Sequence, residues 1–173
     1  HLTTRAFLLS GAALAVSAKA AILMHADSGR VLYEKTADEH MLIASTTKLM
    51  TAIVVLEHCA LDDLVEVDRR SAGIEGSSMY LKAGESYTVE DLRYGLLLVS
   101  GNDEASALAL HVADSMEEFA ELMNAKAAEL GMTESSFKTA HGLDEEGNNS
   151  TARAMAKLAD YSKGNEDFAR IAG

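Results

Sequence analysis

An unbroken apolar segment, Leu49–Leu56, most constrains what this chain can fold into. Its residues, Leu-Met-Thr-Ala-Ile-Val-Val-Leu, leave no face of a helix for solvent. A helix that is apolar on every side is buried on every side, so this one should run through the middle of a core. The chain has 173 residues, of which 48% are hydrophobic, and this is enough for one globular domain around such a helix.

Ser45-Thr46-Thr47-Lys48 stands directly before the apolar segment and offers a reactive pair. Ser45 and Lys48 are three residues apart, so on a helix they share one face. A lysine can take the serine proton only if desolvation or a nearby cation lowers its pKa, and the apolar segment supplies dry surroundings. The free N–H groups of a helix N-terminus also favour a developing oxyanion. Alone, Ser-x-x-Lys is a weak signal that any solvated helix start can match.

A second polar group, Ser100-Gly101-Asn102, ends the apolar run 96–99. The Ser100 hydroxyl can relay a proton to a leaving group. The Asn102 carboxamide can hold a peptide backbone, or Lys48, through paired donor and acceptor atoms. Taken by itself, the tripeptide favours a simple turn between two helices.

Short strands are predicted early in the chain and helices after them. Residues 20–25 and 31–33 flank the turn Asp27-Ser28-Gly29 and predict a hairpin. Helix starts are predicted at Thr88–Asp91, at Ser115–Glu118, which resembles a fuller capping box, and at Ser150-Thr151, which opens a last helix. The helix after Ser115 should end at Gly131. This order predicts a mixed α/β domain whose sheet is incomplete.

Composition and charge exclude several functions. The formal net charge is -12 and no Lys/Arg cluster occurs, so a nucleic-acid partner is not expected. The single Cys59 cannot form an internal disulfide and is interpreted as a buried thiol. The histidines show no pair at metal-ligand spacing, so neither a metal site nor a cofactor is predicted. His141 is assigned a structural role in a loop, because a lysine base needs no histidine.

Together and in this order, the two motifs resemble the set shared by penicillin-binding enzymes and class A β-lactamases. The resemblance sharpens to the low-molecular-mass D-alanyl-D-alanine carboxypeptidases, peptidase family S11, over about residues 18–162. Four blocks carry it: Ala-Ser-Thr-Thr-Lys-Leu-Met-Thr (44–51), Gly-Ser-Ser-Met-Tyr-Leu-Lys-Ala-Gly-Glu (76–85), Leu-Val-Ser-Gly-Asn-Asp-Glu-Ala (98–105), and His-Gly-Leu-Asp (141–144) with Ser-Thr-Ala-Arg (150–153).

The resemblance implies a role for each motif residue. Ser45 would be the acylated nucleophile, Lys48 its general base, Ser100 the proton relay and Asn102 a substrate-orienting group. The implied activity is removal of the terminal D-alanine from peptidoglycan stem peptides by two acyl transfers, with β-lactam antibiotics as inhibitors. The implied fold is β-lactamase/transpeptidase-like, an antiparallel sheet flanked by helices. The implied location is outside the cytoplasmic membrane, with attachment to the membrane surface through a C-terminal region.

One family element, Lys-Thr-Gly, does not occur in the sequence. Lys138-Thr139-Ala140 is rejected as a substitute because it directly precedes His141-Gly142. We expect residues 20–173 to be the N-terminal part of the catalytic domain, ending before the strands that close the sheet. Residues 1–19, apolar and rich in small side chains, are interpreted as a signal-like leader or an opening helix.

Two alternatives remain open. A class A β-lactamase would share the first two motifs and use a glutamate to activate the deacylating water; Glu121 is the candidate in this chain. A noncatalytic cell-wall binding module would keep the fold without Lys-Thr-Gly, because fold alone does not determine function.

Overall fold

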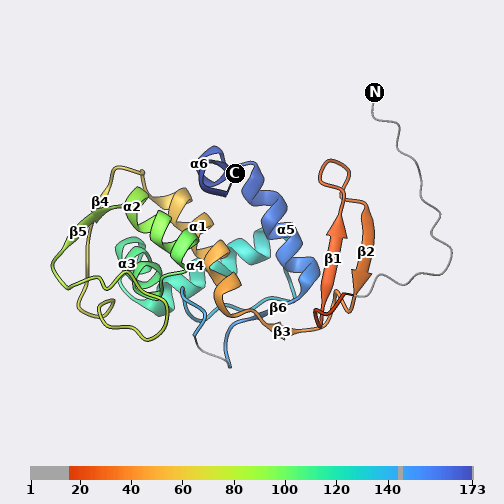
Figure 1. The fold of residues 1–173 in the computed structure, drawn as a ribbon, viewed down its shortest axis with the longest axis horizontal. Coiled ribbons are helices and arrows are strands. Elements are labelled where there is room, and N and C mark those ends of the chain that lie inside the picture. Colours follow the sequence, from red (N-terminus) through yellow and green to blue (C-terminus); the bar gives the residue numbers. More distant parts are fainter. Residues whose placement is uncertain (1–15, 144–145, 173) are drawn as a thin grey trace.

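The computed structural model describes residues 16–143 and 146–172 (Figure 1). The leader or opening helix predicted over residues 1–19 therefore lies almost entirely outside the described residues. The elements follow in the order β1 Ala21–Met24, β2 Val31–Lys35, β3 Met41–Leu42, the 3-10 turn η1 Ala44–Thr46, α1 Thr47–His58, β4 Leu64–Glu66, β5 Ser86–Thr88, α2 Val89–Tyr94, the π-helical turn η2 Gly95–Val99, α3 Asn102–Val112, α4 Met116–Glu129, β6 Asn149–Ser150, α5 Ala152–Lys163 and α6 Glu166–Ala172.

The helix α1 forms the centre of the molecule, as its sequence predicts. Six consecutive side chains, from Met50 to Val55, are each at most 1% exposed. Helices α3, α4 and α5 all pack against α1. In Figure 1, α5 separates α1 from the β1–β2 hairpin at one end of the molecule, while β4 and β5 lie at the other.

The described strands form three separate antiparallel pairs, β1 with β2, β3 with β6, and β4 with β5. The first pair is the predicted hairpin, with Ile22 opposite Glu34 and a bulge between Leu23 and Met24. The second pair joins the segment just before Ser45 to Asn149–Ser150. Mixed helices and antiparallel strands confirm the predicted fold class, and β3–β6 anchors the start of α1.

Helix starts agree with the capping prediction in position but not in detail. Thr88 caps α2 with a complete capping box, in which the hydroxyl accepts from the Asp91 N–H. Ser115 caps α4 by accepting from the Glu118 N–H, but the Glu118 carboxylate accepts from the N–H of Asp114 instead of Ser115. The prediction that Ser115 has the fuller capping box was therefore wrong, because the Glu118 carboxylate accepts from the residue before the N-cap and not from the N-cap itself.

Replacing Thr88 with alanine should lower the free energy of unfolding by about 1 kcal/mol, since one N–H at the start of α2 loses its acceptor. Thr88→Ser keeps the hydroxyl and is the matched control. Its free energy of unfolding should fall by no more than a few tenths of a kcal/mol. Urea denaturation of both variants measures the difference. Equal losses would show that the hydroxyl does not stabilise this helix.

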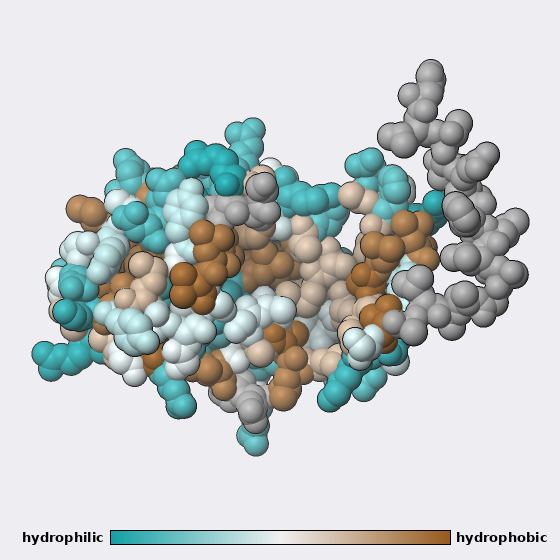
Figure 2. All heavy atoms as spheres, in the orientation of Figure 1, coloured by the Kyte–Doolittle hydropathy of each residue, from teal (hydrophilic) through white to brown (hydrophobic). Residues whose placement is uncertain are grey.

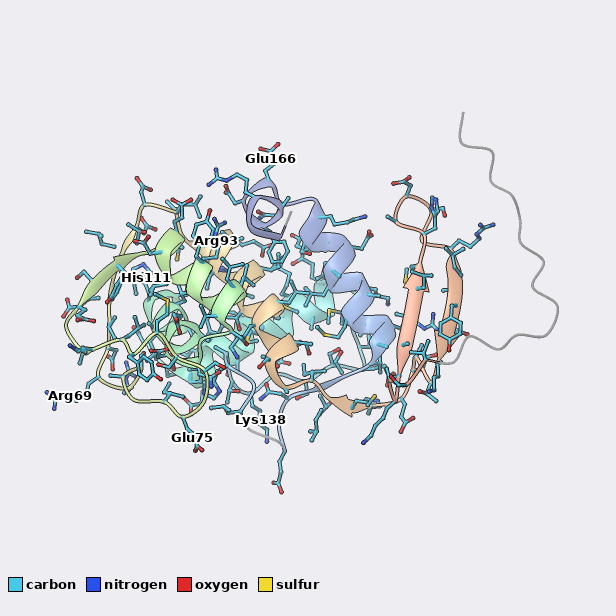
Figure 3. All side chains as sticks on the ribbon, viewed as in Figure 1. Arg69, Glu75, Arg93, His111, Lys138 and Glu166 are labelled. Carbon is cyan, nitrogen blue, oxygen red and sulfur yellow. The ribbon has the colours of Figure 1, made fainter. Side chains whose placement is uncertain are left out.

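Two helices have no clear signal in the sequence. Helix α3 has a buried side chain at every position from Asn102 to Ala109, so it lacks a polar face. Helix α6 follows the helix that was predicted to be the last. It docks on α2 through Arg93, labelled in Figure 3, whose Nη1 donates to the carbonyl oxygen of Asp167 at 2.7 Å.

The surface is mostly polar, with apolar side chains exposed at a few places. Figure 2 shows apolar spheres on the hairpin end of the molecule, where Leu23, Val31 and Leu32 are exposed. Among the helices of the described residues, none combines the length and the apolar character needed to cross a bilayer.

Candidate active site

Ser45 and Lys48 lie side by side at the start of α1, as their spacing predicts. Ser45 is exposed in the turn η1, whereas Lys48, in the first turn of α1, is only 3% exposed. The Lys48 Nζ donates to the Ser45 Oγ at 3.4 Å. A solvent-accessible hydroxyl therefore faces a buried amine, which is the arrangement of a nucleophile and its base.

The backbone around residue 141 holds Lys48 from the other side. The Lys48 Nζ also donates to the His141 carbonyl oxygen at 3.1 Å. One turn along α1, the Thr51 hydroxyl donates to the Ala140 carbonyl oxygen at 2.7 Å. The His141 ring accepts from the Leu143 N–H through Nδ1, in line with its predicted role in a loop. It is thus the main chain of His141, and not its ring, that contacts Lys48.

Burial lowers the pKa of the Lys48 ammonium, and the charge of Glu104 opposes this shift. The direction agrees with the prediction that dry surroundings favour a neutral amine. The lowered pKa increases the fraction of Lys48 able to accept the Ser45 proton. The opposing glutamate was not predicted.

The Ser100-Gly101-Asn102 tripeptide connects η2 to α3. Ser100 adopts a left-handed conformation, with φ 59 and ψ 38, and Asn102 begins α3. The Asn102 Nδ2 donates to the carbonyl oxygen of Glu75 at 2.7 Å, and its N–H donates to that of Ser77 at 2.7 Å. The asparagine therefore fixes segment 75–77 beside the start of α3.

Asp103 extends this attachment to the rest of the glycine-bounded segment 76–84. Its fully buried carboxylate accepts from the Ser78 hydroxyl at 2.6 Å and from the Leu81 N–H at 2.9 Å. Although burial opposes the change, hydrogen bonds from Glu104, Ser78 and the backbone lower the pKa of Asp103. Segment 76–84 is thus bound to the helix that starts at Asn102.

Glu104 is the least expected member of the site. It is 0% exposed, and no described donor reaches either carboxylate oxygen. Burial raises the pKa of Glu104 to about 8, and the neighbouring Asp103 carboxylate adds to the shift. The side chain fits against two glycines: a Cβ on Gly101 would lie 1.7 Å from its Oε2, and one on Gly95 would lie 2.5 Å from its Oε1.

Glu121, the residue that the β-lactamase alternative would require, lies elsewhere. It is exposed on α4 and shares a surface pocket with His111 and Val112, at the C-terminal end of α3. The tripeptide 100–102 stands at the opposite end of that helix. This position gives Glu121 no access to an acyl group on Ser45.

The comparisons with known proteins agree with this geometry. The sequence profile of the family described as D-alanyl-D-alanine carboxypeptidase, peptidase S11, matches residues 8–171. The chain belongs to this family. The S11 match spans the Ser-x-x-Lys and Ser-Gly-Asn motifs and both of the helices that position them.

Among curated S11 relatives, D-alanyl-D-alanine carboxypeptidase DacF of Bacillus subtilis is 42% identical over 153 residues, which are 84% of this chain and 39% of the relative. DacC of Escherichia coli is 45% identical over 154 residues, which are 83% of this chain and 38% of the relative. The chain thus spans about two fifths of the length of these relatives.

Solved structures show the same fold. The carboxypeptidase DacD from Francisella tularensis superposes with a TM-score of 0.87 at 32% identity, over 96% of this chain and 42% of that one. A mutant of the Streptomyces K15 DD-transpeptidase has a TM-score of 0.86 at 32% identity, over 91% of this chain and 65% of that one. These likenesses confirm the predicted transpeptidase-like fold.

Proposed function

We propose that the protein to which this chain belongs is a serine D-alanyl-D-alanine carboxypeptidase that removes the terminal D-alanine from peptidoglycan stem peptides. The observation that carries the proposal is the hydrogen bond between Lys48 and Ser45, made by a buried amine whose pKa is lowered. The names of the relatives DacF and DacC support the same reaction.

In the proposed acylation step, the neutral Lys48 Nζ accepts the Ser45 proton while Oγ attacks the carbonyl carbon of the penultimate D-alanine. The peptide bond breaks, and the Ser100 hydroxyl passes a proton to the departing D-alanine nitrogen. Asn102 orients the peptide backbone. Glu104, with its pKa of about 8, is mostly a neutral acid at pH 7, so its charge opposes the lowered pKa of Lys48 only weakly at that pH.

In the proposed deacylation step, water attacks the ester carbonyl and returns the shortened peptide and the free Ser45 hydroxyl. A β-lactam would acylate the same oxygen and leave it blocked. Since stem peptides lie outside the cytoplasmic membrane, we place the activity there. Attachment to the membrane surface through a C-terminal region belongs to the same proposal.

Intact mass after incubation with benzylpenicillin tests the proposal on the full-length natural protein. We expect the mass to rise by that of one penicillin molecule, and Ser45→Ala to abolish the adduct completely. Ser28→Ala, in the exposed turn between β1 and β2, is the matched control and should be acylated like the native protein. An absent adduct, or one that survives in Ser45→Ala, would overturn the proposed nucleophile.

A chromogenic cephalosporin distinguishes the β-lactamase alternative in the same samples. A carboxypeptidase should stay acylated after about one turnover, because Glu121, the glutamate that the β-lactamase alternative requires, is exposed on α4 and does not reach Ser45. Continuous rapid turnover would instead support a β-lactamase.

A further inference from the structure

Three metal-ligating side chains meet away from Ser45. The Cys59 Sγ, a carboxylate oxygen of Asp63 and a ring nitrogen of His111 all lie within 4.8 Å of one another. Cys59 is the C-cap of α1, His111 lies in the last turn of α3, and Asp63 directly precedes β4. Spacing along the sequence predicts no such site, because only the packing of α1 against α3 brings Cys59 to His111.

We propose that Cys59, Asp63 and His111 bind a divalent transition-metal ion of the zinc type, with water completing the coordination. Thiolate, imidazole and carboxylate are the ligands that zinc takes in proteins. Around a tetrahedral zinc ion such ligand atoms lie roughly 3.3–3.6 Å apart, by the usual bond lengths. Closing the cluster therefore requires movements of about 1 Å. Asp63 and His111 are exposed, so side-chain rotation can provide them.

The local electrostatics favour a cation at this position. The C-terminal ends of α1 and α3 meet here, and each carries the partial negative charge of its helix dipole. The formal charge of the whole chain is -12, which raises the local concentration of cations further. On binding, the Cys59 thiol gives its proton to the solvent and the sulfur donates its electron pair to the metal.

The Asp63 carboxylate is already held in place for this role. Its Oδ2 accepts the Ala60 N–H at 2.8 Å, the kind of supporting hydrogen bond that orients metal-binding carboxylates. Figure 3 labels His111, whose ring comes from α3 and not from the helix that carries Cys59. A bound metal would therefore join the ends of two core helices to the start of β4.

The proposed metal site is separate from the candidate active site. The 12 residues of α1 span about 18 Å, and Ser45 and Cys59 stand at opposite ends of them. The same holds for Asn102 and His111 on α3. A metal at this distance takes no part in acyl transfer, so the inference stands independently of the proposed function.

Cobalt titration of the reduced, metal-free protein tests the site. A thiolate bound to Co²⁺ gives a charge-transfer band in the near ultraviolet, and the only cysteine in the chain is Cys59, so the band reports this ligand alone. We expect one Co²⁺ per chain, displaced by Zn²⁺, and no band in Cys59→Ser. Circular dichroism first confirms that each variant is folded.

Matched variants distinguish a three-ligand site from a thiol acting alone. His111→Gln and Asp63→Asn should each weaken Co²⁺ binding at least tenfold, while His40→Gln and Asp62→Asn, which alter residues of the same types outside the cluster, should leave it unchanged. The proposal is overturned if no band forms at equimolar Co²⁺. It is equally overturned if His111→Gln binds as tightly as the native protein.

Discussion

Replacing Glu104 with glutamine should make the folded protein increasingly more stable than the native protein as the pH rises from about 5 to about 9. The pKa of Glu104 is raised from 4.5 to about 8 in the folded state. Between these values the folded state holds a proton that the unfolded chain has lost. The stability that this proton contributes is complete below pH 4.5 and is lost as the pH rises through 8.

The glutamine amide imitates the protonated acid at every pH. It fills nearly the same space between Gly95 and Gly101 and places no charge beside Asp103. At about 1.4 kcal/mol per pKa unit, the advantage of Glu104→Gln over the native protein should grow by on the order of 4 kcal/mol across this range.

Urea denaturation of both proteins at pH about 5 and about 9 measures this increase in the stability difference. Subtracting the native curve removes the contributions of the titrating groups that do not interact with Glu104. Glu121→Gln, which alters an exposed carboxylate on α4, is the matched control and should show no comparable growth. If the difference between the native protein and Glu104→Gln were the same at both pH values, the buried carboxyl would not be protonated in the fold.

Local sequence patterns were sufficient to predict how Ser45 and Lys48 lie in the candidate site. The apolar segment 49–56 correctly predicted a buried helix, because a helix that is apolar on every side must be covered by other elements of the fold. Helical spacing then places Lys48 over Ser45 without any tertiary information. The hairpin at 21–35 was predictable for the same reason, since alternation and turn residues are local properties.

The start of α3 and the position of His141 depend on tertiary packing, which local sequence patterns do not reveal. Helix α3 starts with Asn102, Asp103 and Glu104, and three polar residues in sequence usually indicate a solvated surface. Here every position from Asn102 to Ala109 is buried, so the carboxyl of Glu104 meets glycines where water would be expected. The approach of His141 to Lys48 likewise arises only when the chain returns to α1 after α4.

Replacing Gly142 with alanine should lower the free energy of unfolding by on the order of 3 kcal/mol. Gly142 has a φ of +79, a left-handed conformation that costs a side chain about 1 kcal/mol. A Cβ there would also lie 2.1 Å from the Ala44 carbonyl oxygen, immediately before Ser45. Because that neighbour is backbone, segment 139–142 would have to move away from η1.

Such a movement would lengthen the hydrogen bonds that Lys48 and Thr51 make to this segment, which explains why the loss should exceed the conformational cost alone. Gly29→Ala separates the two effects, since Gly29 has a similar φ of +65 with no atom within 4 Å of the added Cβ. Its loss should stay near 1 kcal/mol in the same urea experiment. Equal losses in the two variants would mean that segment 139–142 does not press on the turn that carries Ser45.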